Sequence, residues 1–419
     1  MFQTGFSMSS RIGFVLVAVA ILLLNAAHVQ SQVLVNQISA EKVTANWKSA
    51  KWKAPSGWRP VVDVKDAQKW AIDLESVIKK KDAKTFSDVL LDRDQFLKAA
   101  ISEIPESDYK KGLSQGFSSA LQATLKQMAD SSDFSVRGIR YTKFGPTVLT
   151  RLLNADGTVT YCLWRLIRNR KGQLKAIDFM NLGSGEWTTE TLGRAGILNM
   201  PTEASLLKKL SGKQLEFSKN QKEFIKMAEA QQAGEFEKAL KIYKTLSPVL
   251  KKEKFVQMMR LNAAMQADDD EYLSAITEFR NAYPDDVASQ LHSIDFYFVK
   301  NDFKRMRETI DTLIKRLGPD AHLYGLKAVG YSSEANHGKA METLKIAIQT
   351  EPDREDNYWS LIESALSAKD FDTVNVVLKT LVKRFGYTEF DLEAVDIYKP
   401  FIGSPQHKDF EGFLKTQAK

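Results

Sequence analysis

Few side chains in this sequence are spaced as a catalytic or metal-binding group would require. No two of the later histidines are four residues apart, and none has the carboxylate neighbours of a zinc site. They are His292, His322, His337 and His407. The single cysteine, Cys162, lies in a β-rich run and is predicted to be a buried apolar residue rather than a nucleophile. The sequence therefore predicts no metal, no cofactor and no enzymatic activity.

One carboxylate could act as an acid or a base if it were buried. Asp178 lies in an apolar run, and tight hairpin turns would place it opposite Arg165, on the sheet face that also carries Tyr161. Burial there would raise the pKa of Asp178. The interpretation that we favour is a cross-strand ion pair between Arg165 and Asp178. The glycines at 183–185 predict a turn, because the residues of a phosphate-binding loop do not follow them.

These residues belong to a segment in which helical patterns give way to strands. Apolar residues recur at helical spacing in three stretches between residues 66 and 128, of which the second runs from Phe86 to Ile101. β-rich runs follow at 134–141, 148–153, 159–167 and 174–180. Asp156-Gly157 is a strong hairpin signal between two of them. This order predicts an α+β domain over residues 63–198, with three helices and an antiparallel sheet.

The arrangement resembles the nuclear-transport-factor-2-like cone, in which helices cover one face of a curved sheet. The resemblance implies a pocket inside the cone, with Tyr161, Arg165 and Asp178 as its candidate residues. Some cone-shaped relatives, such as ketosteroid isomerases, use a carboxylate base and a tyrosine donor in such a pocket. The resemblance also implies that two chains could pair as a homodimer through the exposed face of the sheet.

Residues 221–386 repeat one pattern at intervals of ~34 residues. Each copy has a small or apolar anchor, at Ala239, Ala275, Met306, Ala340 and Val374. Apolar or small residues lie four positions after each anchor and twelve positions before it. Turns between paired helices are predicted at Gly234-Glu235-Phe236, Asn301-Asp302-Phe303 and Lys369-Asp370-Phe371. The pattern predicts five helical hairpins that bury apolar surface against their neighbours.

This pattern resembles five degenerate tetratricopeptide repeats, so the expected fold is a cone-like α+β domain followed by an all-α tetratricopeptide-type solenoid. The resemblance implies a groove lined by the first helix of each hairpin. The candidate groove residues are Arg260, Asp295, Phe298, His322, Trp359 and Glu363. The lysines and asparagines of the family's best-known groove, which holds chaperone C-terminal carboxylates, are absent here. Residues 199–220 are the expected linker and residues 387–419 the expected cap.

The first 31 residues predict export. Arg11 precedes an uncharged, mostly apolar run from Ile12 to Leu24, and small residues follow it. The run is shorter than the ~20 residues that a membrane-spanning helix needs, and this order of features is that of a signal peptide. We therefore expect the protein in the periplasm or outside the cell. The alternative is that the segment stays uncleaved and anchors the chain.

Residues 32–62 form an arm in which Trp47, Trp52 and Trp58 lie among basic residues. Such a segment suits stacking on bases or contact with a membrane interface, but packing of the tryptophans onto the next domain is the interpretation that we favour. The net charge of +7 comes from basic residues interspersed with acidic ones, which does not indicate a specific nucleic-acid partner.

Together these patterns predict an extracytoplasmic scaffold that binds a protein or peptide through its helical groove. The alternative is a small-ligand binder or an enzyme that uses a pocket in the cone domain. A third hypothesis is a structural role, in which the repeats hold the cone domain near a surface.

Overall fold

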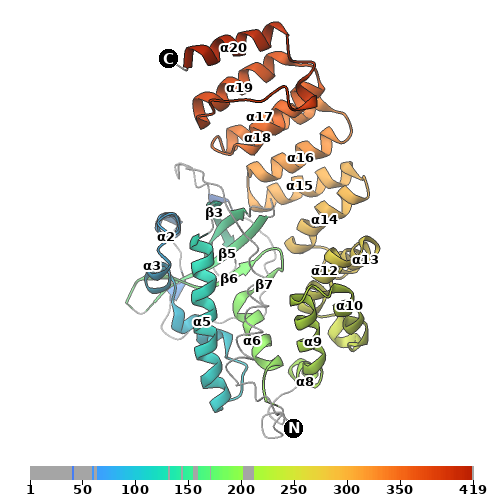
Figure 1. The fold of residues 1–419 in the computed structure, drawn as a ribbon. Coiled ribbons are helices and arrows are strands. Elements are labelled where there is room, and N and C mark those ends of the chain that lie inside the picture. The colour runs from blue at the N-terminus through green and yellow to red at the C-terminus, as the bar shows by residue number, and fades with distance from the viewer. Residues whose placement is uncertain are drawn as a thin grey trace, which may run out of the picture. The chain divides into compact units, whose positions relative to one another are not determined.

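The computed structural model describes most of the chain from residue 64 onward and two short strands before it (Figure 1). The described ranges are 40–41, 59–60, 64–130, 133–142, 145–153, 159–169, 171–201 and 212–417. They form two compact units that divide after His292. The predicted signal peptide and nearly all of the Trp- and Lys-rich arm lie outside the described residues. No helix in the described part of the chain is both long and apolar enough to cross a membrane.

The first unit contains an antiparallel sheet in which consecutive strands are neighbours, as the sequence predicted. Its strands are β3 (Asp133–Thr142), β4 (Gly145–Leu153), β5 (Val159–Arg168), β6 (Leu174–Asn181) and β7 (Glu186–Trp187). Two short strands extend the sheet: β1 (Ala40–Glu41) runs parallel to β3, and β2 (Arg59–Pro60) pairs with the end of β5. The order of hydrogen-bonded neighbours is thus β1-β3-β4-β5-β6-β7, with β2 beside β5.

The two faces of the sheet differ in polarity, because successive side chains of a strand point to opposite faces. On one face, Val148, Trp164 and Phe179 are register partners, and all three are buried apolar residues. The other face carries a buried polar row across four strands, formed by Arg140, Thr147, Arg165 and Asp178. The sheet domain therefore has an apolar core on one side and charged groups enclosed on the other.

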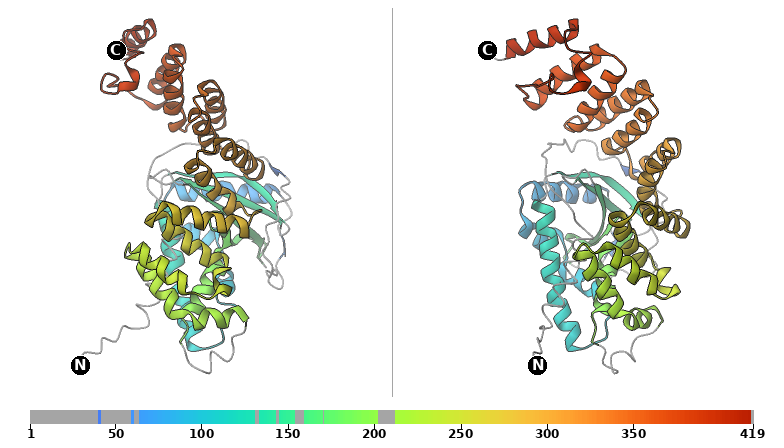
Figure 2. Two further views of the ribbon diagram at one scale, coloured as in Figure 1. Left: turned by 90° about the vertical axis from the view of Figure 1, so that its right-hand side faces the viewer. Right: turned by 45° about the vertical axis from the view of Figure 1, so that its right-hand side comes forward.

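Helices cover the apolar face around Trp164. They are α2 (Val64–Lys79), α3 (Ala83–Thr85), the π-helical turn η1 (Phe86–Leu90) and α4 (Arg93–Ala100), and α5 (Asp108–Asp130) packs against them. The Trp164 ring lies 5.9 Å from that of Trp70 in α2, 5.5 Å from Phe86 in η1 and 4.8 Å from Phe179, between centroids. Figure 2 shows α5 alongside the curved sheet.

The second helix expected from the sequence, from Phe86 to Ile101, is divided in the structure. Leu91 forms a β-bridge with Ala176 of β6, and the Asp92 N–H donates to the Ala176 carbonyl at 2.7 Å. The Asp92 side chain then caps α4 by accepting from the Gln95 N–H at 3.0 Å. Pairing with the sheet thus interrupts the helix. The structure also adds α6 (Thr188–Leu198), which the sequence analysis did not predict.

The rest of the described chain is all-α, as predicted. The first unit continues with α8 (Gly212–Lys219), α9 (Gln221–Gln232), α10 (Phe236–Thr245), α11 (Pro248–Lys251), α12 (Lys254–Ala267) and α13 (Asp269–Ala282), and α14 (Val287–Val299) spans the division between units. The second unit holds α15 (Phe303–Leu317), α16 (Ala321–Ser332), α17 (His337–Thr350), α18 (Asp356–Ser367), α19 (Phe371–Phe385), the 3₁₀ turn η2 (Asp396–Tyr398) and α20 (Pro405–Gln417). Consecutive helices pack in pairs, such as α12 with α13 and α16 with α17.

Local signals explain where these helices begin. At the starts of α13, α15, α16, α17 and α19, a backbone N–H of the first turn donates to the side-chain oxygen of the capping residue. The capping residues are Asp268, Asp302, Asp320, Asn336 and Asp370. The three turns predicted from the sequence are confirmed. Each opens with a residue in the left-handed region, with φ of 74° at Gly234, 53° at Asn301 and 56° at Lys369. This backbone conformation ends one helix and lets the chain reverse into the next.

Candidate functional site

Tyr161, Arg165 and Asp178, the candidates in the sheet domain, are enclosed. The strand register places Arg165 directly opposite Asp178, as predicted, and no more than 2% of each residue's surface is exposed. Burial raises the pKa of Asp178 to about 7, although the Arg165 charge and hydrogen bonds from Thr189 act in the opposite direction. The Arg165 guanidinium also stacks on the Trp187 ring, with Cζ 3.7 Å from the ring centroid.

The Asp178 carboxylate is held by the start of α6. Its Oδ2 accepts from the Thr189 hydroxyl at 2.6 Å, and its Oδ1 accepts from the backbone N–H of Phe179 at 2.9 Å and of Thr189 at 3.2 Å. These bonds fasten α6 to β6. Thr189 was not among the residues predicted from the sequence. Its signal is the Thr188-Thr189-Glu190 run, because threonines and acidic residues favour the first turn of a helix.

Two further arginines lie on the polar face of the sheet. Arg140 is in register with Thr147, and Arg151 is in register with Tyr161. Both side chains are buried, with 2% and 1% of the residue exposed. Neither arginine was predicted from the sequence as a site residue, although each lies beside apolar residues in a predicted strand. The polar face therefore gathers three enclosed guanidinium groups, including that of Arg165.

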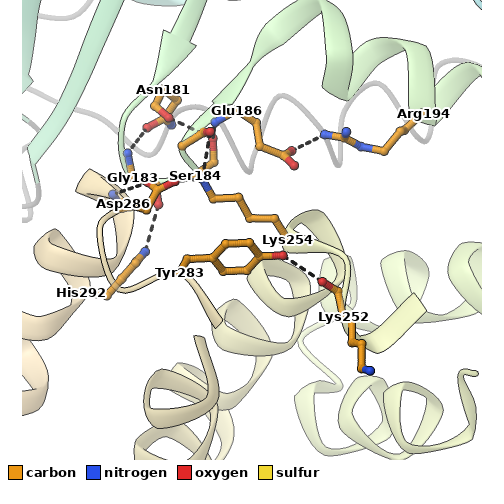
Figure 3. A network of polar contacts seen from close by, with 12 residues as sticks. Asn181, Gly183, Ser184, Glu186, Arg194, Lys252, Lys254, Tyr283, Asp286 and His292 are labelled. Atoms are coloured by element: carbon orange, nitrogen blue, oxygen red, sulfur yellow. Dashed lines mark hydrogen bonds and ion pairs between the residues drawn. The ribbon is translucent and has the colours of Figure 1, made fainter. Parts of the chain in front are cut away.

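The turn between β6 and β7 forms a polar junction with α12 and with the start and body of α14 (Figure 3). Lys254, at the start of α12, donates to the Gly185 carbonyl at 2.9 Å and pairs with Asp286. His292 of α14 approaches the Gly183 carbonyl, with Nε2 at 3.1 Å. These contacts lie within the first unit and join its sheet to its helices. We call this set of contacts the junction.

The junction depends on the turn that the sequence predicted at residues 183–185. Gly185 has φ of +64°, and a Cβ atom there would lie 2.0 Å from Lys254 Nζ. Because the Gly183 carbonyl can only accept, Nε2 of His292 must carry the hydrogen. Removal of the ring from water lowers the pKa of His292. The junction therefore favours a neutral imidazole at His292 and a residue without a side chain at Gly185.

The groove candidates have different surroundings. Arg260 of α12 is buried, pairs with Glu271 at 3.1 Å and Glu278 at 2.6 Å, and lies over the Tyr243 ring. Its guanidinium therefore contacts neighbouring helices. Three further candidates lie in α14 and α16: Asp295 is exposed, Phe298 is 45% exposed, and His322 Nδ1 lies 3.5 Å from Arg354 Nη2.

Trp359 and Glu363, the last two groove candidates, line one pocket of about 350 Å³. They come from α18, and the other lining residues follow α19: Tyr387, Glu389, Phe390, Asp391, Leu392, Val395, Ile397 and Tyr398. We call this the α18 pocket. These later residues were predicted to form a cap. A signal for a site is present in the sequence, because aromatic and acidic residues are mixed from Tyr387 to Asp391.

Three aromatic rings form one wall of the α18 pocket. The Trp359 ring centroid lies 5.5 Å from that of Tyr387 and 6.3 Å from that of Phe390, and the last two are 5.6 Å apart. Glu355 Oε1 accepts from Trp359 Nε1 at 2.8 Å and from the Tyr387 hydroxyl. One carboxylate thus fixes the orientation of two rings. The hydrogen bond to Glu355 also raises the pKa of Tyr387.

The pocket is negatively charged. Its lining includes Glu363, Glu389 and Asp391 and no lysine, arginine or histidine. Burial raises the pKa of Tyr398 to about 12, and the charge of Glu363 adds to the effect, so this phenol is neutral near pH 7. Val395 and Ile397 give the pocket an apolar rim, with 48% and 39% of each residue exposed.

Comparison with known proteins adds no family to this description, because no protein-family model and no curated protein sequence matches the chain. Within the described ranges, no group of three or more His, Cys, Asp or Glu side chains is arranged to hold a metal ion. The fold itself defines the molecule as an α+β domain followed by an all-α region.

Proposed function

We propose that this chain is an exported interaction protein that binds a peptide segment of a partner in the α18 pocket. The observation that carries the proposal is the pocket itself, an open hollow with an aromatic wall, an exposed apolar rim and carboxylates at its edge. Peptide and protein recognition sites combine an aromatic anchor with a polar rim in this way. Neither a metal nor a cofactor enters the proposal.

The helical region is proposed to be a tetratricopeptide-type solenoid of five hairpins. In support, every anchor residue is at most 3% exposed: Ala239, Ala275, Met306, Ala340 and Val374. The residues twelve positions earlier are also buried: Met227, Ala263, Ile294, Ala328 and Ile362. Burial at both positions is what stacking of hairpins requires. In such a stack the first helix of each hairpin lines the groove, and α18 is the first helix of the fifth hairpin.

The cone-like domain is proposed to be a second contact module. The junction supports this role, since it ties the β6–β7 turn to helices of the same compact unit. Export through the predicted signal peptide would place both modules in the periplasm or outside the cell. Pairing of two chains through the sheet is part of the same proposal, and the mass of the particle in solution tests it.

A second candidate function is binding of a small anionic molecule by the sheet domain. It is favoured by Arg140, Arg151 and Arg165, which are enclosed on one face beside Tyr161. Among small carboxylates and phosphates, a ligand of this face should raise the melting temperature of the wild type but not that of Arg151→Met. Lys171→Met, which removes a charge from an exposed turn, should respond like the wild type.

Panning a random dodecapeptide library on the mature full-length chain tests the first proposal. Selected peptides should bind Val395→Asn roughly tenfold more weakly, because burying an apolar side chain of this size contributes ~1.5 kcal/mol. Val376→Asn, which removes an exposed valine from α19, should bind them as the wild type does. The proposal is wrong if no peptide is selected, or if the two variants bind alike.

A further inference from the structure

The α18 pocket has a charge opposite to that of the chain. The whole sequence has 59 basic and 52 acidic residues, for a net charge of +7. The segment from Gly386 to Tyr398 nevertheless contains four acidic residues and no basic one. Three carboxylates of this segment and of α18 line the pocket without a basic neighbour among the lining residues. The local negative charge is therefore a property of the pocket and not of the overall composition.

Two of these carboxylates face solvent. Glu363 and Glu389 are exposed, and within the described part of the chain neither has a salt-bridge partner. Other acidic residues of the same unit are paired, such as Asp353 with Arg384 and Asp409 with Lys379. Because exposed carboxylates at the mouth of a hollow keep their water and their charge, they can attract a cation that enters it.

The aromatic wall suits the same kind of ligand. Trp359, Tyr387 and Phe390 pack against one another, with ring centroids 5.5 to 6.3 Å apart, and all three line the pocket. A cation held against aromatic faces is attracted by their π electrons. Arginine gains most from such a site, because its planar guanidinium stacks on rings while its N–H groups donate to carboxylates in pairs.

From these three observations we propose that the α18 pocket binds a positively charged side chain, arginine in preference to lysine, in an extended segment of the partner protein. The inference rests on the proposed peptide-binding function and specifies its ligand. The side chain stacks on the aromatic wall, its charge is met by Glu363 and Glu389, and the neighbouring residues of the segment contact Val395 and Ile397.

The test uses dodecapeptides selected on the mature full-length chain and measures their binding by fluorescence anisotropy. Selected sequences should contain arginine, and their dissociation constants should rise at least roughly fivefold in Glu363→Gln/Glu389→Gln, because two exposed charge contacts are lost. Glu342→Gln/Glu411→Gln removes two other exposed glutamates of the same unit and should leave binding unchanged. All four substitutions are at exposed positions, and thermal melting checks that each protein is folded.

The outcomes separate the two proposals. Peptides that lose affinity in Val395→Asn but contain no basic residue would overturn the choice of ligand and leave the peptide-binding function standing. Equal weakening by the two glutamate pairs would also overturn it, since it would show a general effect of net charge. If no selected peptide depends on Val395, both the ligand and the function are wrong.

Discussion

The sheet domain and the α18 pocket use charged side chains in opposite ways. In the sheet domain, Asp178 is enclosed, accepts three hydrogen bonds and faces Arg165. In the pocket, Glu363 and Glu389 are exposed beside aromatic rings, and no salt bridge in the described ranges uses them. Charges that the fold satisfies hold elements together, whereas charges left at the mouth of a hollow are available to a ligand. Substitutions in the two regions should therefore affect different properties.

The largest effect is expected from Asp178→Ala. It removes a buried carboxylate that faces Arg165 and that fastens α6 through its hydrogen bonds, and this loss should cost roughly 3–5 kcal/mol. Urea unfolding followed by circular dichroism measures this loss. Asp73→Ala, at an exposed position of α2, should change the free energy of unfolding by no more than ~0.5 kcal/mol. A similar loss in both variants would contradict the structural role of Asp178.

The next effect concerns the junction. Gly185→Ala should lower the free energy of unfolding by about 2–3 kcal/mol, because its Cβ displaces Lys254 and its φ is strained. Gly172→Ala has a similar φ of +76° and nothing within 4 Å of the added atom, so only the strain of ~1 kcal/mol remains. Equal losses in the two variants would show that the contact between Lys254 and the turn contributes nothing.

A smaller effect should appear in the pH dependence of stability. Because the folded pKa of His292 is lowered, the unfolded chain takes up a proton below about pH 6.5 that the folded chain does not. The stability of the wild type relative to His292→Gln should therefore fall as the pH drops from 7 to 5 and stay constant above pH 7. Asp178 titrates in both proteins, so the difference isolates His292. If the free energies of unfolding of the wild type and of His292→Gln changed in parallel with pH, the pKa of His292 would not be lowered.

Local patterns predicted the sheet domain best. The alternation of β5 and β6 predicted that Arg165 and Asp178 share a face, but a β-bulge between Arg165 and Leu166 sets the register that makes them direct partners. The break at Leu91 was missed, since it is caused by pairing with Ala176, a residue far along the chain. A local sequence pattern cannot predict a contact between residues so far apart in the chain.

The α18 pocket was predicted only in part, for the same reason. Trp359 and Glu363 were groove candidates from the alignment of the repeats, and both line the pocket. Tyr387 and Phe390 contact Trp359 because the irregular segment after α19 folds back toward α18. An irregular segment has no periodic sequence pattern from which its course could be predicted. The charge of that segment was nevertheless readable in the sequence, and it is the part of the pattern that carries the ligand proposal.

The central claim, that the pocket recognises a positive charge, is tested most directly by exchanging one arginine of a selected peptide for citrulline. Citrulline has nearly the same shape but no charge, so the measurement isolates the charge from the fit. In titrations against the full-length chain, we predict that the exchange weakens binding at least roughly tenfold at low salt, and that the difference shrinks as added salt screens the exposed carboxylates. Equal affinities of the arginine and citrulline peptides at every salt concentration would contradict the claim.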